Sequence, residues 1–284
     1  MSNDYDEALI IFQSSLANFL DKTAPPDRIT NWNKNKQVER DAWLAAGEFG
    51  MLGVLVPEEY GGLGVDFRYE RAIMEALSKR GLEGWGIPVH NTIAAPYLIE
   101  YGTPDQKSKW LPKVVSGEVI MAIAMTEPGA GSDLQGIRTR AVRDGDEWVI
   151  NGSKVFISNG QMSDLILLIA KTEMVDDKDK ISIFLVEGGR VGFQRGKNLD
   201  KVGRDAQDTS ELFFENLRLP LDSVLGDIPG RGFIQLTGRY NYKQMEKALG
   251  IDLTSTWSKA HQASKPEIAA QSAVAYWKSR VAPK

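Results

Sequence analysis

Residues 126–133 read Thr126-Glu127-Pro128-Gly129-Ala130-Gly131-Ser132-Asp133 and directly follow the apolar run 119–125. Two glycines in this stretch allow the backbone to turn tightly and to approach a ligand closely. The hydroxyls of Thr126 and Ser132 can donate or accept hydrogen bonds, and successive backbone N–H groups in such a turn form a concave site for anionic oxygens. The stretch predicts a strand that ends in a ligand-binding turn.

Strand-like runs follow this turn at short intervals. We expect strands at 119–125, 148–150, 154–157, 165–171, 181–187 and 211–215. Asn151-Gly152 is a two-residue hairpin signal between two of these runs. The charged residues 176–180 are typical of a solvated hairpin tip. Closely spaced strands joined by short turns indicate an antiparallel barrel or sandwich.

The residues before the turn have helical periodicity instead. The pattern predicts a first helix through residues 9–20, stopped by Pro25-Pro26, and then helices at 38–51, 67–79, 92–100 and 105–115. Helices followed by strands favour an α+β fold with segregated domains. We expect a helical domain over 1–118, an antiparallel β-barrel-like domain over 119–228, and a short helical segment over 229–284.

Composition excludes several function classes. The chain has 284 residues, a net charge of −4, no cysteine and two histidines. Disulfides, thiolate metal sites and histidine-rich metal sites are therefore excluded, and no basic surface for nucleic acid is indicated. The acidic N-terminus lacks the basic region of a signal peptide, and no apolar run approaches the length of a membrane span. These features predict a soluble, cytoplasmic protein.

A second block, residues 148–160, reads Trp-Val-Ile-Asn-Gly-Ser-Lys-Val-Phe-Ile-Ser-Asn-Gly. Together with residues 126–133 it resembles the flavin-binding middle domain of the acyl-CoA dehydrogenase family. Further pieces in the family's order, among them 60–64, 101–107 and 201–204, extend the resemblance over about residues 5–235. The resemblance implies FAD as cofactor, an acyl-CoA thioester as substrate and an electron-transfer flavoprotein as a possible partner.

The resemblance also implies which residues contact the cofactor: Met125, Thr126, Gly131, Ser132, Phe156, Ile157 and Ser158. Thr126 would face the pyrimidine edge of the flavin, and Ser132 would lie where flavin and acyl-CoA meet. Phe156 takes a place where the family often has tryptophan beside the ring. Taken alone, Phe156 would be a core residue of a strand. Among the remaining polar residues, His90 is interpreted as a structural residue with satisfied hydrogen bonds.

The family's reaction removes an α-proton from the acyl-CoA and moves hydride from the β-carbon to flavin N5. A carboxylate is the usual base, and in this family it belongs to a C-terminal helical bundle. Nothing after about Gly230 resembles that bundle, and neither Glu246 nor Glu267 aligns with the base. Glu127 has a structural role in the family. The catalytic residue therefore stays unassigned, and the sequence predicts weak or absent turnover; acyl chain length and oligomeric state are not predicted.

The tail has a different likeness. Residues 230–242 and 248–253 resemble plant-type chitinases and phage endolysins, which suggests a chimera with its junction near 230–236. This leaves two alternative functions open. One is a glycoside-hydrolase fragment, although such enzymes need two carboxylates that precede the matching segment. The other is a non-catalytic protein that binds flavin or CoA.

Overall fold

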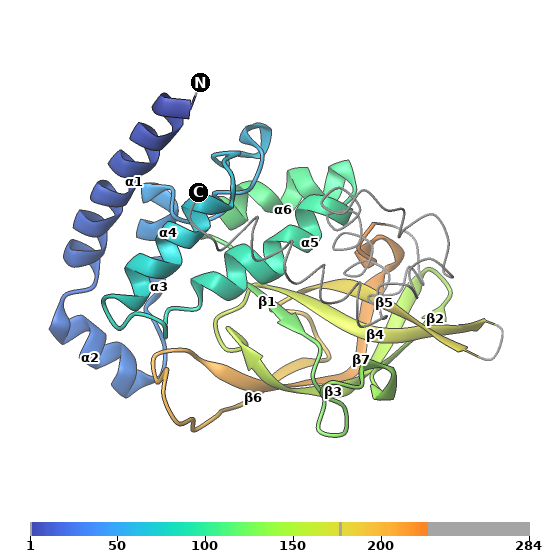
Figure 1. Cartoon of the computed structure of the whole chain (residues 1–284). Coiled ribbons are helices and arrows are strands. Elements are labelled where there is room, and N and C mark those ends of the chain that lie inside the picture. Colours follow the sequence, from blue (N-terminus) through green and yellow to red (C-terminus); the bar gives the residue numbers. More distant parts are fainter. Residues whose placement is uncertain (1, 176–177, 227–284) are drawn as a thin grey trace, which may run out of the picture. The chain divides into compact units, whose positions relative to one another are not determined.

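Helices precede a sheet in the part of the chain that the structure, a computed structural model, describes: residues 2–175 and 178–226. These residues belong to one compact unit, with the helices in blue to green and the strands in green to orange (Figure 1). The α-helices are α1 (Ser2–Thr23), α2 (Pro26–Asn35), α3 (Arg40–Phe49), α4 (Phe67–Ser78), α5 (Ala95–Tyr101) and α6 (Pro104–Ser116). None of the described helices is long and apolar enough to cross a bilayer.

The helix predictions are confirmed except at one place. The five predicted helices correspond to α1, α3, α4, α5 and α6; their ends shift by at most three residues, except that α1 begins seven residues before the predicted start. The helix α2 was missed because Pro25-Pro26 reads as a stop. Pro26 instead occupies the first turn of α2, where a missing N–H costs nothing. The segment just before α5 also differs, since residues Val89–Ala94 form a π-helical turn, η2.

Three tryptophans form the centre of the helical part. Trp32, Trp43 and Trp85 are each at most 2% exposed, and the Trp85 ring centroid lies 5.3 Å from that of Trp32 and 6.3 Å from that of Trp43. Both pairs meet edge to face, the arrangement that aromatic quadrupoles favour. His90 extends the cluster, with its ring 5.6 Å from Trp43. The cluster joins α2, α3, the segment after α4 and η2 into one core.

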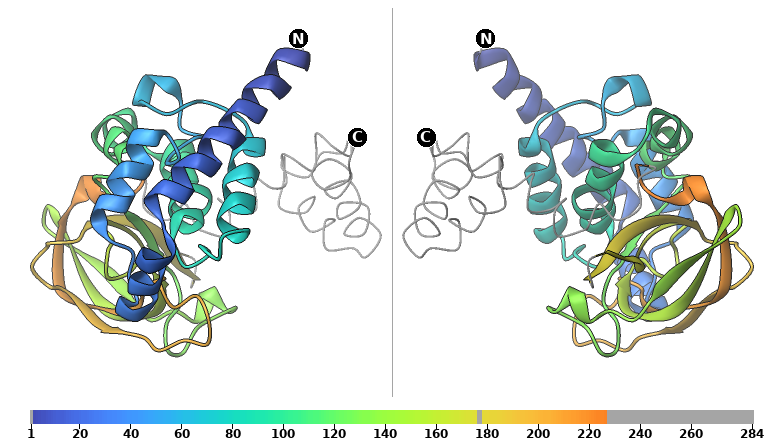
Figure 2. Two further views of the ribbon diagram at one scale, coloured as in Figure 1. Left: turned by 90° about the vertical axis from the view of Figure 1, so that its left-hand side faces the viewer. Right: turned by 90° about the vertical axis from the view of Figure 1, so that its right-hand side faces the viewer.

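The sheet has seven strands: β1 (Met121–Ala124), β2 (Arg140–Asp144), β3 (Glu147–Ser158), β4 (Leu165–Val175), β5 (Lys178–Glu187), β6 (Phe193–Asn198) and β7 (Thr209–Pro220). Their order is β1-β4-β2-β3-β7-β6, with β5 also paired to β4. Figure 2 shows the sheet curling around on itself. The predicted all-antiparallel sheet is wrong in one respect: β4 runs parallel to both β1 and β2.

The hairpin predicted at Asn151-Gly152 is also wrong. Both residues lie inside the continuous strand β3, and the true two-residue loop is Gly145-Asp146, between β2 and β3. Gly152 is needed for close packing, because a Cβ there would lie 2.4 Å from Thr139 Oγ1. β4 and β5 are antiparallel neighbours, as a hairpin at the predicted charged tip requires; residues 178–180 of that tip belong to β5, and residues 176–177 lie outside the described chain.

Gln106 ties the start of α6 to the end of the strand part. Its Oε1 accepts hydrogen bonds from Thr103 N and Gly226 N, and its Nε2 donates to Asp222 O and Val224 O, all at 2.8–3.1 Å. With its backbone N–H bonded to Thr103 Oγ1, it also completes a capping box on the helix. The side chain is thus fully satisfied although it is only 8% exposed.

Candidate functional site

A buried ion pair holds the turn that follows β1. Lys154 Nζ donates to Glu127 Oε1 at 2.8 Å and to Met125 O at 2.9 Å. The carboxylate also accepts hydrogen bonds from Arg138 N at 2.6 Å and Thr139 N at 3.0 Å. Glu127 is 7% exposed and Lys154 is 1% exposed. One lysine on β3 therefore fixes the backbone at residues 125–127, together with the chain that returns towards β2.

The charge state of Glu127 follows from these contacts. Burial alone would raise the pKa of its carboxyl, but the hydrogen bonds from Lys154, Thr139 and Arg138 hold that pKa below its ordinary value. Glu127 is therefore ionised at neutral pH, and its oxygens are already committed to the protein. This agrees with the structural role predicted for Glu127 and leaves it unsuited to abstracting a substrate proton.

Phe156 stands outside the regular alternation of β3. The pairing with β7 passes from Lys154 opposite Leu212 to Ile157 opposite Ser210, so β3 contains one extra residue and bulges. Phe156 has the left-handed φ of 61° in this bulge and is 66% exposed, whereas Ile157 is 2% exposed. The core position that Phe156 would have if it were taken alone is therefore not found, and its predicted contact with the cofactor stays a prediction. A bulky aromatic residue is strained in this conformation and loses its burial as well.

The turn after β1 and the bulge in β3 are in direct contact. Val155 N donates to Thr126 O at 2.9 Å, which places Met125, Thr126 and Phe156 beside one another. Thr126 and Met125 are half-buried. Ser158 ends β3, is also half-buried, and pairs with Thr209 on β7.

Gly131 and Ser132 lie further along the turn and are exposed. Residues 127–130 close tightly, since the backbones of Glu127 and Ala130 exchange two hydrogen bonds of 2.9 and 3.1 Å. A Cβ added to Gly129 or Gly131 would have no atom of the described chain within 4 Å. The space over both glycines is open, and neither glycine is needed for packing within the described chain.

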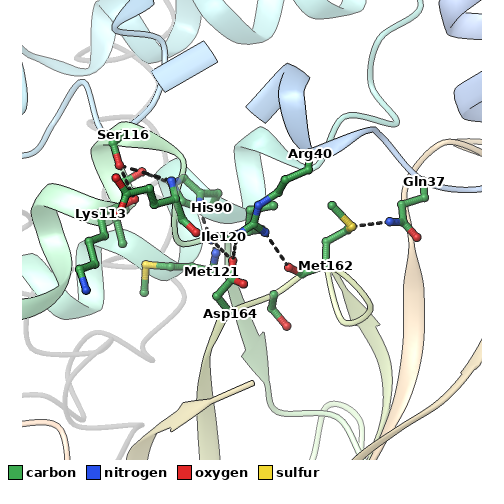
Figure 3. Close-up of polar contacts among 12 residues, drawn as sticks. Gln37, Arg40, His90, Lys113, Ser116, Ile120, Met121, Met162 and Asp164 are labelled. Atoms are coloured by element: carbon green, nitrogen blue, oxygen red, sulfur yellow. Dashed lines mark hydrogen bonds and ion pairs between the residues drawn. The ribbon is translucent and has the colours of Figure 1, made fainter. Parts of the chain in front are cut away.

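The start of β1 is anchored to the helical part (Figure 3). Ile120 N donates to Asp164 Oδ2 at 2.8 Å, and the same carboxylate is paired with Arg40 at 2.7 Å. His90 Nδ1 accepts from Met121 N, and its Nε2 is 3.1 Å from Val114 O. Since one ring nitrogen accepts and the other donates, the imidazole is neutral. Burial lowers the pKa of His90 to about 4, and the structural interpretation of this residue is confirmed.

Sequence reasoning missed two residues that shape the site, Lys154 and Asn159. Each is 1% exposed. A lysine directly before the apolar residues 155–157 of a strand is a signal for a buried ion pair, but the partner 27 positions away is not visible in the sequence. Asn159 gives a weaker signal, since an asparagine before glycine is usually a surface turn.

Comparisons with known proteins agree with this geometry. The family model for the N-terminal domain of acyl-CoA dehydrogenases matches residues 6–118, and the model for the middle domain matches residues 122–217. The mouse long-chain specific acyl-CoA dehydrogenase is 45% identical over 228 residues, which cover 80% of this chain and 53% of that protein. The isovaleryl-CoA dehydrogenase of potato is 36% identical over 249 residues, or 87% of this chain and 60% of that protein. The chain thus spans about half the length of the curated relatives it matches.

Solved structures show the same likeness. An acyl-CoA dehydrogenase from Geobacillus kaustophilus is 38% identical with a TM-score of 0.77, and the match covers 95% of this chain and 74% of that one. An acyl-CoA dehydrogenase complexed with FAD, from Bacillus anthracis, is 29% identical with a TM-score of 0.74 and covers 88% of this chain and 42% of that one. Members of this family are FAD-binding flavoproteins. The chain belongs to the acyl-CoA dehydrogenase family.

Proposed function

We propose that this protein binds FAD at the turn after β1 and the bulge in β3, and that it takes part in the α,β-dehydrogenation of an acyl-CoA thioester. The observation that carries the proposal is Phe156. A 66% exposed aromatic ring, held in a strained conformation beside Thr126, has no role in the described core. Strain of this kind persists where the surrounding structure imposes it, and such positions cluster at ligand sites.

The surrounding residues fit a flavin. Phe156 offers an apolar face for the ring system, while the half-buried Thr126 and Ser158 offer hydroxyls as hydrogen-bonding groups. Gly131 and Ser132 border open space, where backbone N–H groups and a hydroxyl suit the phosphate oxygens of a dinucleotide or of CoA. Glu127 and Lys154 do not face the ligand in this scheme; their ion pair keeps the turn in place.

The flavin supplies the redox chemistry as acceptor of a hydride from the substrate β-carbon. The protein orients the ring against Phe156, binds its polar edge and excludes water. Removing the α-proton requires a base. The one acidic side chain of the turn that is buried, Glu127, is already hydrogen-bonded to Lys154 and the backbone, so the base comes from outside these residues. An electron-transfer flavoprotein is the proposed electron acceptor.

Several finer points belong to the same proposal. A similar solved chain, 28% identical with a TM-score of 0.76, is described as the electron transferring flavoprotein of Acidaminococcus fermentans. The curated mouse and potato relatives are named as mitochondrial, and the cytoplasmic location of this chain stays a prediction. The chitinase-like tail and the weak turnover also stay predictions, and residues 227–284 lie outside the described chain.

Flavin binding tests the proposal directly. FAD is titrated into the purified full chain and followed by visible absorption and by quenching of flavin fluorescence. Phe156→Ala should weaken FAD binding at least tenfold. Phe213→Ala is the matched control, because Phe213 is a 42% exposed phenylalanine on the adjacent strand β7, and it should leave binding unchanged. Equal effects of the two variants would contradict the proposed site, and no uptake of FAD by the parent chain would contradict the function.

Acyl-CoA added anaerobically to the FAD-loaded chain separates binding from turnover. Bleaching of the visible absorption band of the bound flavin would show that the chain reaches a base. A flavin that stays oxidised would support the prediction of weak or absent turnover. A series of acyl chain lengths in the same experiment reports the preferred substrate.

A further inference from the structure

The backbone N–H and C=O of Met121, the first residue of β1, are held by two side chains from distant segments. Met121 N donates to His90 Nδ1 at 3.1 Å, and Met121 O accepts from Asn159 Nδ2 at 3.1 Å. His90 comes from η2, whereas Asn159 directly follows the end of β3. Figure 3 shows His90 and Met121 where the helical and strand parts meet. β1 is paired with β4 here, with Met121 opposite Leu165, and the two side chains supply the hydrogen bonds of the Met121 backbone groups.

Asn159 is packed between the helical part and the strand part, and it hydrogen-bonds to both. Its second Nδ2 hydrogen bond goes to Gly86 O at 3.0 Å, its backbone N–H donates to Asp208 O at 3.0 Å, and its carbonyl accepts from Ser163 N at 2.8 Å. Its φ is 61°, a conformation that asparagine tolerates better than most residues. A Cβ on Gly86 would lie 1.8 Å from Asn159 Oδ1, so the fit leaves no space on the opposite side.

These contacts join the start of β1 to the residue that follows β3. Met121 is joined to Asn159 at one end, and Thr126 O is joined to Val155 N at the other. Between the two joints lie the residues proposed to contact flavin on both segments: Met125, Phe156, Ile157 and Ser158. The joint at Asn159 therefore sets how far, and at what angle, the end of β3 lies from β1.

We propose that Asn159 is a positioning residue of the flavin site. It is 1% exposed and its amide is committed to two carbonyls, so it acts through the strands and not by touching the ligand. This inference rests on the proposed function. According to this proposal, the buried Asn159 sets the distance between the turn at Thr126 and the bulge at Phe156.

The test uses FAD and the full chain. Asn159→Asp keeps the shape and the tolerance of left-handed φ, but replaces an amide donor by an acceptor that faces two carbonyl oxygens. Asn159→Gly removes the side chain without backbone strain and serves if the aspartate variant fails to fold. Asn91→Ala is the control, because Asn91 is equally buried, yet it binds Met51 O and Gly53 N within the helical part.

Two readouts are compared. The first is FAD binding, where an Asn159 variant should raise the dissociation constant at least tenfold and alter the visible circular dichroism of bound flavin. The second needs no flavin: amide hydrogen exchange should quicken at residues 121–126 and 155–158. Asn91→Ala should lower the melting temperature but leave FAD affinity within twofold and exchange in these segments unchanged.

Each outcome decides the inference. Loss of affinity and faster local exchange in the Asn159 variants alone would support it. An Asn159 variant that binds FAD like the parent, or an equal loss in Asn91→Ala, would overturn it. If the parent chain takes up no FAD, the proposed function fails. Exchange alone then decides whether Asn159 joins the strands, and unchanged exchange at 121–126 would overturn that as well.

Discussion

Glu127 and Glu70 are both buried carboxyl groups, 7% and 1% exposed, but the strand part and the helical part surround them differently. Glu127 accepts hydrogen bonds from Lys154 and from two backbone N–H groups. On α4, neither oxygen of Glu70 has a hydrogen bond of normal geometry. The polar side chain that faces it, Asn91, already binds Met51 and Gly53.

The difference lies in the charge that each region carries at neutral pH. Burial raises the pKa of Glu70 to about 8, and the contact with Asn91 offsets this only in part. Glu70 is therefore protonated near pH 7, a state in which burial costs far less. The strand part contains a buried ionised carboxylate, Glu127, whose hydrogen bonds order a turn at the site. The buried carboxyl group of the helical part, Glu70, is neutral instead. A buried carboxyl group therefore indicates the candidate site only when the residues that hydrogen-bond to it belong to that site, as they do for Glu127.

Lys154→Met should have the largest effect. It leaves the ionised Glu127 buried without its counter-charge, which costs about 3–5 kcal/mol of unfolding free energy. Chemical denaturation at neutral pH measures the loss. Adding Glu127→Gln to this variant should recover part of it. Lys109→Met is the control, because its ion pair with Glu187 is exposed and contributes about 1 kcal/mol or less. A Lys154 effect as small as that of Lys109 would refute the buried-charge argument.

Glu70→Gln should stabilise the protein at and above neutral pH. The folded pKa of about 8 lies above the ordinary value of 4.5, so the parent chain loses stability as pH rises from 4.5 to 8. At pH 7, about 2.5 units above the ordinary pKa, the difference between the variant and the parent should be on the order of 3 kcal/mol. Below pH 4.5 it should vanish. Denaturation curves across this range measure it, and a pH-independent difference would show that Glu70 does not titrate as described.

His90 should have the opposite pH dependence. Its folded pKa of about 4 lies below the ordinary 6.5, so its contribution to stability is lost as pH falls from 6.5 to 4. The slope is at most about 1.4 kcal/mol per pH unit. Buried Asp208, whose pKa burial raises to about 6, opposes this trend between pH 6 and 3.8. NMR titration of the ring therefore measures the pKa of His90 directly. A His90 ring that protonates near pH 6.5 would contradict the buried hydrogen bond from Met121 N to His90 Nδ1.

Phe156→Asn should have the smallest effect on stability, and this effect should be a gain. Asparagine tolerates the left-handed bulge position, so the variant should gain up to about 1 kcal/mol of stability while losing the exposed ring. Phe213→Asn lies in regular strand structure and should lose stability instead, since asparagine disfavours strands. Thermal melts of the two variants would separate strain held at the site from ordinary strand packing.

Sequence patterns predicted the fold well where a signal is local. The helical periodicity of α4 and the apolar run of β1 both depend on neighbouring residues. The hairpin at Asn151-Gly152 failed because the same dipeptide serves close packing against Thr139. The parallel pairing of β4 with β1 depends on contacts between distant residues, and no local pattern reports it.

The candidate site was predicted from the resemblance more than from single residues. That resemblance brought Thr126, Phe156 and Ser158 together, and the structure places Thr126 beside the bulge of Phe156. The exposure of Phe156 and the strain at its backbone were not predictable, because both arise from one extra residue relative to β7. Asn159 was missed for a similar reason, since its partners Gly86 and Met121 lie far away in sequence.

The hydrogen bonds of Gln106 have a consequence for how this protein unfolds. Its hydrogen bond with Gly226 N spans 120 positions, so one amide closes a loop that contains the whole sheet. Opening that loop breaks the three hydrogen bonds of the Gln106 side chain with Asp222 O, Val224 O and Gly226 N, while its hydrogen bonds with Thr103 stay within the helix cap. The helical part therefore loses these three hydrogen bonds whenever the strands detach. Residues 2–226 should melt in one cooperative transition, and the flavin site should disappear in that transition and not before it.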